Sequence, residues 1–188
     1  FNGLVRKNAS FDYEGELASE IRTSEDGKAI TFVLRDNVRF HDGKPFTSAD
    51  VKYTFDELFR TKGYKSFAFY ETVDKNTPPI AHITSIETPD AKTVVFNLEK
   101  AALKNQLLSN LVAIPIVSEG SSSQLREKPI GTGPFKFTAF DQSQNTVDLE
   151  AFADYWDGAP KVAKLRVKTV TDASALQAEL QSGGVDLA

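Results

Sequence analysis

Several stretches of the chain alternate between apolar and polar residues with the period of two that is typical of β-strands. In the first of them, Ile30, Phe32 and Leu34 fall on one face, and turn-forming residues flank the run. The stretches with this pattern are residues 30–40, 92–98, 135–140, 147–151 and 163–169. In the first, the turn formers Asp36 and Asn37 predict a hairpin whose second strand is residues 38–40, and we expect the third stretch to pair with the fourth across the polar turn between them.

Helical patterns are fewer. Thr47 is a good N-cap, and Asp50 three residues later resembles a capping box. The apolar residues that follow have the spacing of one helix face: Val51, Phe55, Leu58 and Phe59. Leucines over residues 103–111 predict a second helix, and a third is predicted from Asp172 to the stop at Gly183. Strands separated by both hairpin turns and helices indicate a mixed α/β or α+β fold.

Composition and charge indicate an ordinary globular protein and argue against several other classes. The chain has 188 residues with 40% hydrophobic and 26% charged residues, which is an ordinary globular mixture and predicts one or two domains. Its apolar runs are shorter than a membrane span requires. A net charge of −4 disfavours nucleic-acid binding, and the absence of cysteine excludes disulfides and thiolate metal sites.

The two ends and one internal stretch bear on domain organisation. The sequence opens on Phe1 rather than Met and shows no leader pattern, and it stops where a strand would begin, so we expect a fragment or a processed piece. The serine-rich residues 118–128 are the expected boundary between two sub-structures.

No catalytic constellation is visible in the residues themselves. There are two histidines with no HExxH spacing, no GxSxG motif occurs, and we expect neither a metal nor a cofactor. The glycines around Thr132 lead into a strand rather than a helix, which favours a turn over a phosphate loop. We interpret the chain as a non-catalytic domain; a hydrolase using His41 or the pair Asp154 and Asp157 stays open as an alternative.

Three blocks of sequence carry a resemblance to a known family. They are residues 16–51, with Thr31-Phe32-Val33-Leu34-Arg35-Asp36-Asn37-Val38-Arg39-Phe40-His41-Asp42-Gly43-Lys44-Pro45-Phe46-Thr47 at their centre, then Pro129-Ile130-Gly131-Thr132-Gly133-Pro134-Phe135, and finally residues 154–158 with 172–186. Together they closely resemble the extracytoplasmic solute-binding proteins of peptide, dipeptide and nickel ABC importers, solute-binding family 5.

The resemblance implies a periplasmic-binding-protein-like fold of type II, in which two lobes close over a solute. This chain would be most of lobe I only, a mixed sheet with flanking helices plus an inserted subdomain. Residues 1–18 and 129–188 would be part of lobe I proper, residues 19–128 the inserted subdomain, and the second lobe would be absent from this chain.

The resemblance also implies two cleft-facing segments, one at the start of the chain and one ahead of Pro115. The ligand-binding residues carried over are Phe1, Asn2 and Gly3 from the first segment, and Asn110, Leu111, Val112 and Ala113 from the second. Nickel-chelate binders of the family place an arginine near the second segment. This sequence has none there, which favours a peptide or another small organic solute.

The implied partner is an ABC-transporter permease in the membrane, and the implied location is extracytoplasmic, in the periplasm or as a cell-surface lipoprotein. We expect a monomer that binds no nucleic acid, and we expect an isolated lobe to bind solute poorly. A scaffold or docking module of the same fold is the main rival, which a large exposed apolar patch would favour.

Overall fold

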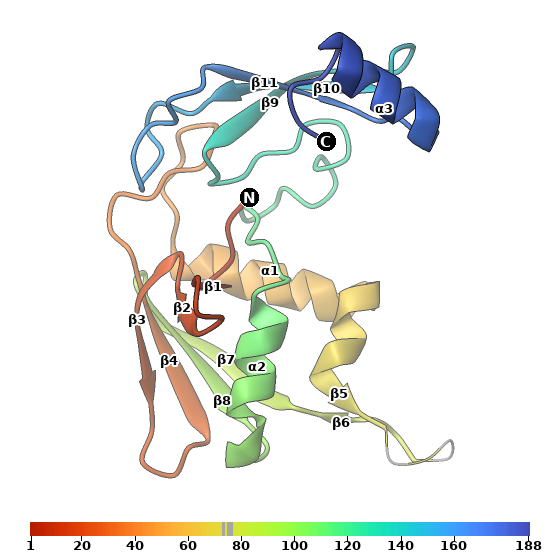
Figure 1. Ribbon diagram of the computed structural model, residues 1–188. Helices are drawn as coiled ribbons and strands as arrows, with labels where there is room; N and C mark the ends of the chain where they lie inside the picture. The colour runs from red at the N-terminus through yellow and green to blue at the C-terminus, as the bar shows by residue number, and fades with distance from the viewer. Residues whose placement is uncertain (73, 75–76) are drawn as a thin grey trace.

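The computed structural model describes residues 1–72, 74 and 77–188, and it shows a larger part below and a smaller part above (Figure 1). Its strands are β1 (Val5–Lys7), β2 (Tyr13–Gly15), β3 (Ala18–Thr23), β4 (Ala29–Leu34), β5 (Tyr70–Glu71), β6 (Ile80–Ala81), β7 (Ile83–Asp90), β8 (Thr93–Leu98), β9 (Phe135–Asp141), β10 (Thr146–Ala151) and β11 (Lys164–Lys168). The α-helices are α1 (Ser48–Arg60), α2 (Lys104–Leu111) and α3 (Ala173–Ser182), and the 3₁₀ helices are η1 (Tyr64–Phe69) and η2 (Ala101–Leu103).

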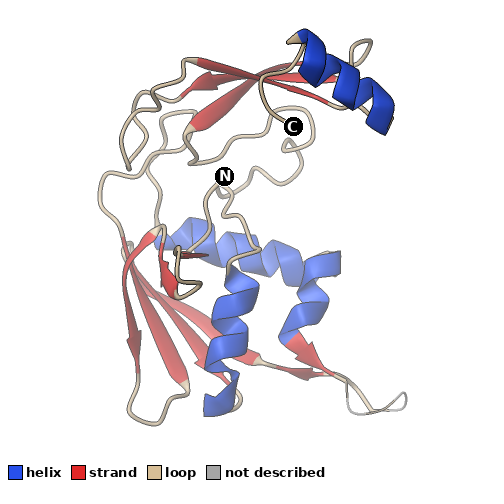
Figure 2. Cartoon of the chain, in the orientation of Figure 1, coloured by secondary structure: helices blue, strands red, loops and turns tan. Residues whose placement is uncertain are grey.

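The larger part is built on a four-stranded sheet in the order β3-β4-β8-β7. On its buried face, Ile30 lies opposite Phe96 and Phe32 opposite Val94. Helices α1 and α2 lie on the same side of this sheet (Figure 2). The ring of Phe55 from α1 meets the ring of Phe96 edge-on, with 5.1 Å between the ring centroids. The predicted periodicity of the two central strands therefore identifies the core face correctly.

Helix α1 begins where its capping residues predict. Oδ2 of Asp50 accepts a hydrogen bond from the backbone N–H of Thr47 at 2.8 Å. Oδ1 of Asp50 accepts another from the N–H of Glu119 at 2.8 Å, and the hydroxyl of Tyr53 lies 2.7 Å from Oγ of Ser122. The serine-rich stretch 118–128 contains no helix or strand, and these contacts attach it to α1.

The smaller part is a three-stranded sheet in the order β11-β10-β9 together with α3. The expected pairing of residues 135–140 with 147–151 is confirmed, and Val147 lies opposite Phe140. Asp172 caps α3 by accepting from the N–H of Ala175 at 2.8 Å, and Gly183 ends it with a φ of 73°. Every residue of β11 is exposed, so this part has little core of its own.

The fold class is confirmed as mixed α and β, but two expectations about the strands are corrected. Every strand pair of the described residues is antiparallel, so the expected mixed sheet is not formed by this part of the chain. Hairpins join β3 to β4, β7 to β8 and β9 to β10, whereas a parallel pair needs a longer crossover.

The predicted hairpin within residues 30–40, with residues 38–40 as its second strand, is wrong. Asn37 has a left-handed φ of 59°, and the chain turns away from the sheet there. Arg39 instead forms an isolated bridge with Pro45, while β4 lies between β8 and β3. Strand β3 escaped prediction because Glu20 and Arg22 give this edge strand a largely polar pattern. Among the described residues, no helix combines the length and apolar character needed to cross a membrane.

Candidate functional site

The first three residues run alongside the stretch that follows α2. The carbonyl of Asn2 accepts from the N–H of Ile116 at 3.0 Å. A Cβ placed on Gly3 would lie 3.3 Å from the carbonyl oxygens of both Leu111 and Ile114, so the two backbones approach closely here. The structure therefore brings together the two segments that the family resemblance implies, although more than a hundred residues separate them in sequence.

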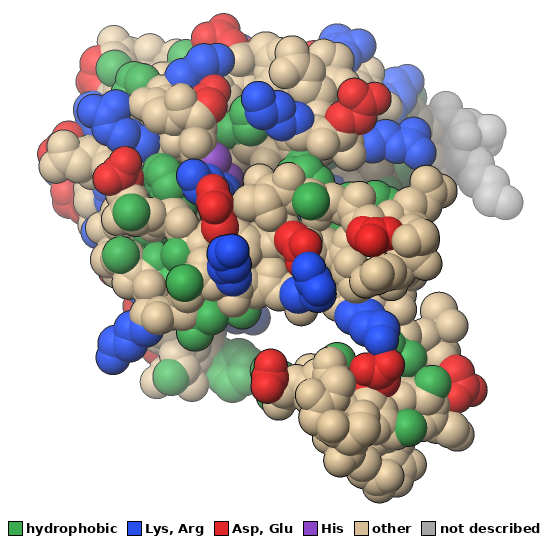
Figure 3. Space-filling model, turned by 90° about the horizontal axis from the view of Figure 1, so that it is seen from above, with side chains coloured by type: hydrophobic (Ala, Val, Ile, Leu, Met, Phe, Trp, Pro, Cys, Tyr) green, Lys and Arg blue, Asp and Glu red, His purple; other side chains and the backbone are tan. Residues whose placement is uncertain are grey.

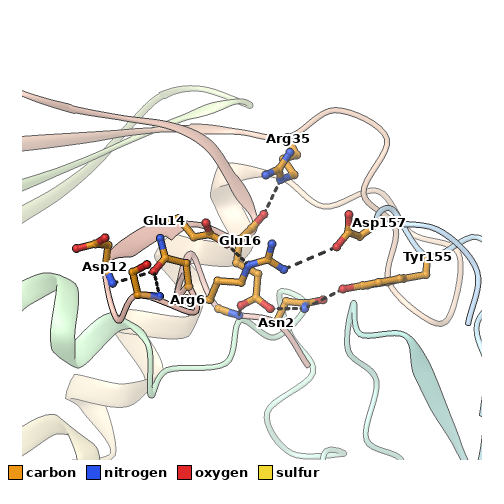
Figure 4. A network of polar contacts seen from close by, with 11 residues as sticks. Asn2, Arg6, Asp12, Glu14, Glu16, Arg35, Tyr155 and Asp157 are labelled. Atoms are coloured by element: carbon orange, nitrogen blue, oxygen red, sulfur yellow. Dashed lines mark hydrogen bonds and ion pairs between the residues drawn. The ribbon is translucent and has the colours of Figure 1, made fainter.

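Asn2 lies at the centre of a polar cluster between the larger and the smaller part (Figure 4). Its side chain is 5% exposed, and Nδ2 donates to Oε1 of Glu16 at 2.6 Å. Oδ1 accepts from the hydroxyl of Thr132 at 3.1 Å and from Nε1 of Trp156 at 3.5 Å. The hydroxyl of Tyr155 lies 3.5 Å from Nδ2, and burial raises the pKa of Tyr155 above its ordinary value, so the phenol stays neutral.

Phe1 packs against the turn that leads into β9. A Cβ on Gly131 would lie 2.8 Å from the ring of Phe1, and one on Gly133 would lie 2.8 Å from its backbone nitrogen. The ring is half exposed. The turn, which the sequence suggested was a simple entry to a strand, is thus also the surface on which Phe1 rests, and this close approach explains both glycines.

His41 fastens the same turn to the larger part. Its Nε2 lies 2.9 Å from the carbonyl oxygen of Gly133, and its Nδ1 accepts from the N–H of Gly131 at 3.3 Å. Burial lowers the pKa of His41, which favours the neutral ring that this pattern of donor and acceptor requires. Both ring nitrogens face backbone groups, and no serine hydroxyl or carboxylate bonds to them in the described residues.

A groove of about 300 Å³ lies between η1 and α2. Its lining consists of three aromatic residues, three small residues, one isoleucine, one asparagine and one lysine: Tyr64, Lys65, Phe67, Ala68, Phe69, Ser109, Asn110, Ala113 and Ile114. Tyr64 is 91% and Phe67 65% exposed, which is high for rings of this size. A second groove of about 400 Å³ lies on the other side of Phe67, bordered by Phe59 and Tyr70.

The four predicted residues of the second segment lie in different surroundings. Asn110 lines the groove, and its Nδ2 donates to the carbonyl of Ala68 at 2.8 Å. Ala113 also lines the groove, and its carbonyl accepts from Nζ of Lys65. Val112 is 38% exposed, whereas Leu111 is 1% exposed and belongs to the core. Leu111 can therefore shape this surface but offers no side-chain contact to a solute.

Sequence reasoning missed the two most exposed rings of the groove. Tyr64 and Phe67 stand in a short run of aromatic and polar residues with neither helical nor strand periodicity, directly after the end of α1. The one available signal was that run itself, since a 3₁₀ turn leaves some of its aromatic rings without core partners.

The groove presents groups that can make contacts with a small molecule. Apolar rings, amide groups and backbone carbonyls can hold a small organic molecule by burial and hydrogen bonds. Within the part of the chain that the structure describes, no group of three or more His, Asp or Glu side chains could hold a metal ion. Basic, acidic and hydrophobic side chains are interspersed on the upper face of the molecule (Figure 3), without a field of one sign.

The chain is similar to known proteins along nearly its whole length. Residues 12–188 match the family of bacterial extracellular solute-binding proteins, family 5 middle. A putative ABC transporter peptide-binding protein of Brucella ovis is 37% identical over 180 residues, which cover 91% of this chain and 32% of the relative. The chain thus spans about a third of the length of the curated relatives it matches.

Solved structures also match nearly the whole chain. The protein AgaA in complex with agropinic acid, from A. tumefacien R10, is 30% identical with a TM-score of 0.80, and the match covers 98% of this chain and 36% of that one. The oligopeptide-binding protein AppA of Bacillus subtilis in complex with a nonapeptide is 27% identical with a TM-score of 0.77, over 98% of this chain and 37% of that one.

Proposed function

Because the chain belongs to the bacterial extracellular solute-binding proteins of family 5, we propose that it forms one lobe of a receptor that captures peptides or similar small organic solutes for an ABC importer. The observation that carries this proposal is the family match over residues 12–188. The receptor delivers its solute to a permease in the membrane, works outside the cytoplasm as a monomer, binds no nucleic acid and catalyses no reaction.

The proposal places this chain in a longer protein, called the full receptor below. Support comes from one curated relative and two solved structures, of which the chain covers 32%, 38% and 36%. In that protein, residues 1–18 and 129–188 belong to the lobe proper, and residues 19–128 form an inserted subdomain. The contacts of Phe1 with Gly131 and of Asn2 with Thr132 support the joining of the two outer stretches.

We place the solute-contacting surface of this lobe on the groove between η1 and α2 and on the adjoining residues 1–3. Exposed rings supply apolar contact, and amides and carbonyls supply hydrogen bonds that suit a peptide backbone. A groove of about 300 Å³ on one lobe is shallow, since a second lobe must cover the solute to exclude water. The isolated chain is therefore expected to bind solute weakly.

The test is to replace Phe67 by alanine in the full receptor. Burying an exposed phenylalanine ring stabilises a complex by about 1.5 to 3 kcal/mol, so the dissociation constant measured by calorimetry should rise by about tenfold or more. Phe140→Ala is the matched control, because its ring is 54% exposed on β9, outside the groove. Unchanged affinity in Phe67→Ala, with a solute that binds the unaltered receptor, would refute this placement of the surface.

A docking role is a second candidate, and one observation favours it. The three-stranded sheet carries two cross-strand rows of apolar residues, Phe140-Val147-Val167 and Phe137-Leu149-Leu165. Phe140 and Val167 are each more than half exposed. Amide hydrogen exchange of β11, compared between the full receptor and the 188-residue chain, separates the two: β11 pairs with β10 in both, so added protection in the full receptor means that the receptor itself covers this face, and equal exchange means that the face stays open for a partner.

A further inference from the structure

Glu16 lies in the turn between β2 and β3 and is held from several sides. Its backbone N–H donates to the carbonyl of Leu4 at 2.9 Å, and its own carbonyl accepts from Nε of Arg35 at 2.6 Å. Its carboxylate points at the start of the chain (Figure 4): Oε2 accepts from the N–H of Gly3 at 2.7 Å and Oε1 from Nδ2 of Asn2 at 2.6 Å. A single carboxylate therefore holds both the backbone and the side chain of the first segment.

The same carboxylate fixes which way the amide of Asn2 faces. An ionised carboxylate can only accept hydrogen bonds, so the NH₂ group of Asn2 must face Glu16. Oδ1 of Asn2 then faces the opposite way, toward the hydroxyl of Thr132 and the indole N–H of Trp156. Thr132 is fully buried, so its hydroxyl depends on this acceptor.

The position in which Glu16 holds Gly3 bears on the proposed solute surface through backbone contacts. Gly3 abuts the carbonyls of Leu111 and Ile114, and Ile114 lines the groove between η1 and α2. On the other side, Trp156 belongs to the smaller part, and the guanidinium of Arg35 lies 4.6 Å from the centroid of its ring. Glu16 thus stands between the groove and the turn that carries Tyr155 and Trp156.

We propose that Glu16 is a positioning residue, which sets Asn2 and Gly3 against the groove and aligns the smaller part with it. This inference rests on the proposed function for its effect on solute binding. Its effect on local geometry can be measured in the 188-residue chain without any solute, so failure of one can be told from failure of the other.

The first experiment uses proton–nitrogen NMR of the chain and two resolvable signals, the amide of Gly3 and the indole of Trp156, the sole tryptophan. In Glu16→Gln, both signals should move, because a glutamine side chain offers only one oxygen to two donors. In Asn2→Ala, the indole signal should move while the amide of Gly3 keeps the downfield proton shift of a carboxylate-bonded donor. Glu20→Gln removes a charge from the neighbouring strand and should move neither.

The second experiment measures solute affinity in the full receptor. Glu16→Gln should weaken binding by about tenfold, the size expected for losing one charge-assisted hydrogen bond, and Glu20→Gln should leave it unchanged. The double variant with Asn2→Ala should bind solute no more weakly than Glu16→Gln alone, because the loss of the carboxylate already releases both Asn2 and Gly3.

Two results would overturn the inference. One is a Glu16→Gln chain whose Gly3 and Trp156 signals coincide with those of the unaltered protein. The other is unchanged solute affinity in a folded Glu16→Gln receptor. If Glu16→Gln does not fold, the spectrum of Asn2→Ala provides the test. If the amide proton of Gly3 loses its downfield shift in that variant, the hydrogen bond from Gly3 to Glu16 is contradicted. If no solute binds the unaltered receptor, the proposed function fails, and the NMR result still decides the positioning.

Discussion

Replacing His41 by alanine tests how the turn before β9 is held to the larger part. The ring of His41 bonds to two backbone groups of that turn, the carbonyl of Gly133 and the N–H of Gly131. Both glycines are buried, so these groups lose their partners in the variant and gain little water in exchange. A buried polar group without a partner costs about 1 to 3 kcal/mol, and we expect His41→Ala to lower the free energy of unfolding by about 2 to 4 kcal/mol at pH 8.

The same substitution should remove a pH dependence. Burial, the largest cause, lowers the pKa of His41 in the folded protein. The positive charges of the N-terminus and Lys136 act in the same direction, while the bond to Gly133 and the charge of Asp42 oppose it. The unfolded chain, whose histidines titrate near pH 6.5, therefore takes up the proton first as the pH falls. Stability is fully present above about pH 6.5 and declines below it, by at most about 1.4 kcal/mol per pH unit for one proton.

Urea unfolding of both proteins between pH 5 and pH 8 provides the measurement. Subtracting the two curves removes the pH dependence that both proteins share and leaves the contribution of His41. We expect the difference in unfolding free energy to be largest at pH 8 and to shrink toward pH 5. Parallel curves, or a difference below about 0.5 kcal/mol at pH 8, would mean that hydrogen bonds of a neutral His41 ring do not stabilise this turn.

Three further substitutions test the core and the surface. Phe55→Ala removes a ring that contacts three other aromatic rings in the fully buried core, and calorimetry should show a loss of about 3 to 5 kcal/mol; a loss below 1 kcal/mol would contradict the packing. Gly15→Ala would place a Cβ 2.2 Å from the carbonyl oxygen of Ala18, so the melting temperature should fall by several degrees, and an unchanged value would argue against this turn. Val167→Thr on the exposed face of β11 should change the unfolding free energy by less than about 0.5 kcal/mol, and a larger loss would mean that this face is covered.

Elements with strong local signals could be predicted from the sequence. The alternation around Val94 and Phe96 and the cap at Thr47 both identify their elements, because periodicity and capping depend on neighbouring residues only. Strand β3 and helix η1 lack such a signal. The edge strand is polar on much of its length, and the 3₁₀ turn follows neither period.

The candidate site could be predicted only in part, because its contacts join segments that are far apart in sequence. The resemblance singled out Phe1, Asn2 and Gly3, but nothing in their local sequence indicates that Glu16 and Thr132 bind the side chain of Asn2. Such contacts arise from the close approach of chain segments far apart in sequence. The same holds for Gly131 and Gly133: a Cβ on the first would meet the ring of Phe1 and a Cβ on the second its backbone nitrogen, and neither approach can be read from local sequence.

The most direct test of solute capture is a thermal-shift screen of the full receptor beside the 188-residue chain. The panel contains dipeptides, longer peptides, nickel chelates, opines and small oligosaccharides. A solute at about 100 times its dissociation constant stabilises the protein that binds it by about 2.7 kcal/mol, which raises the melting temperature by a few degrees. We predict that one solute class stabilises the full receptor and leaves the isolated chain unchanged. If no solute stabilises either protein, solute capture by this lobe is contradicted and the docking role takes its place.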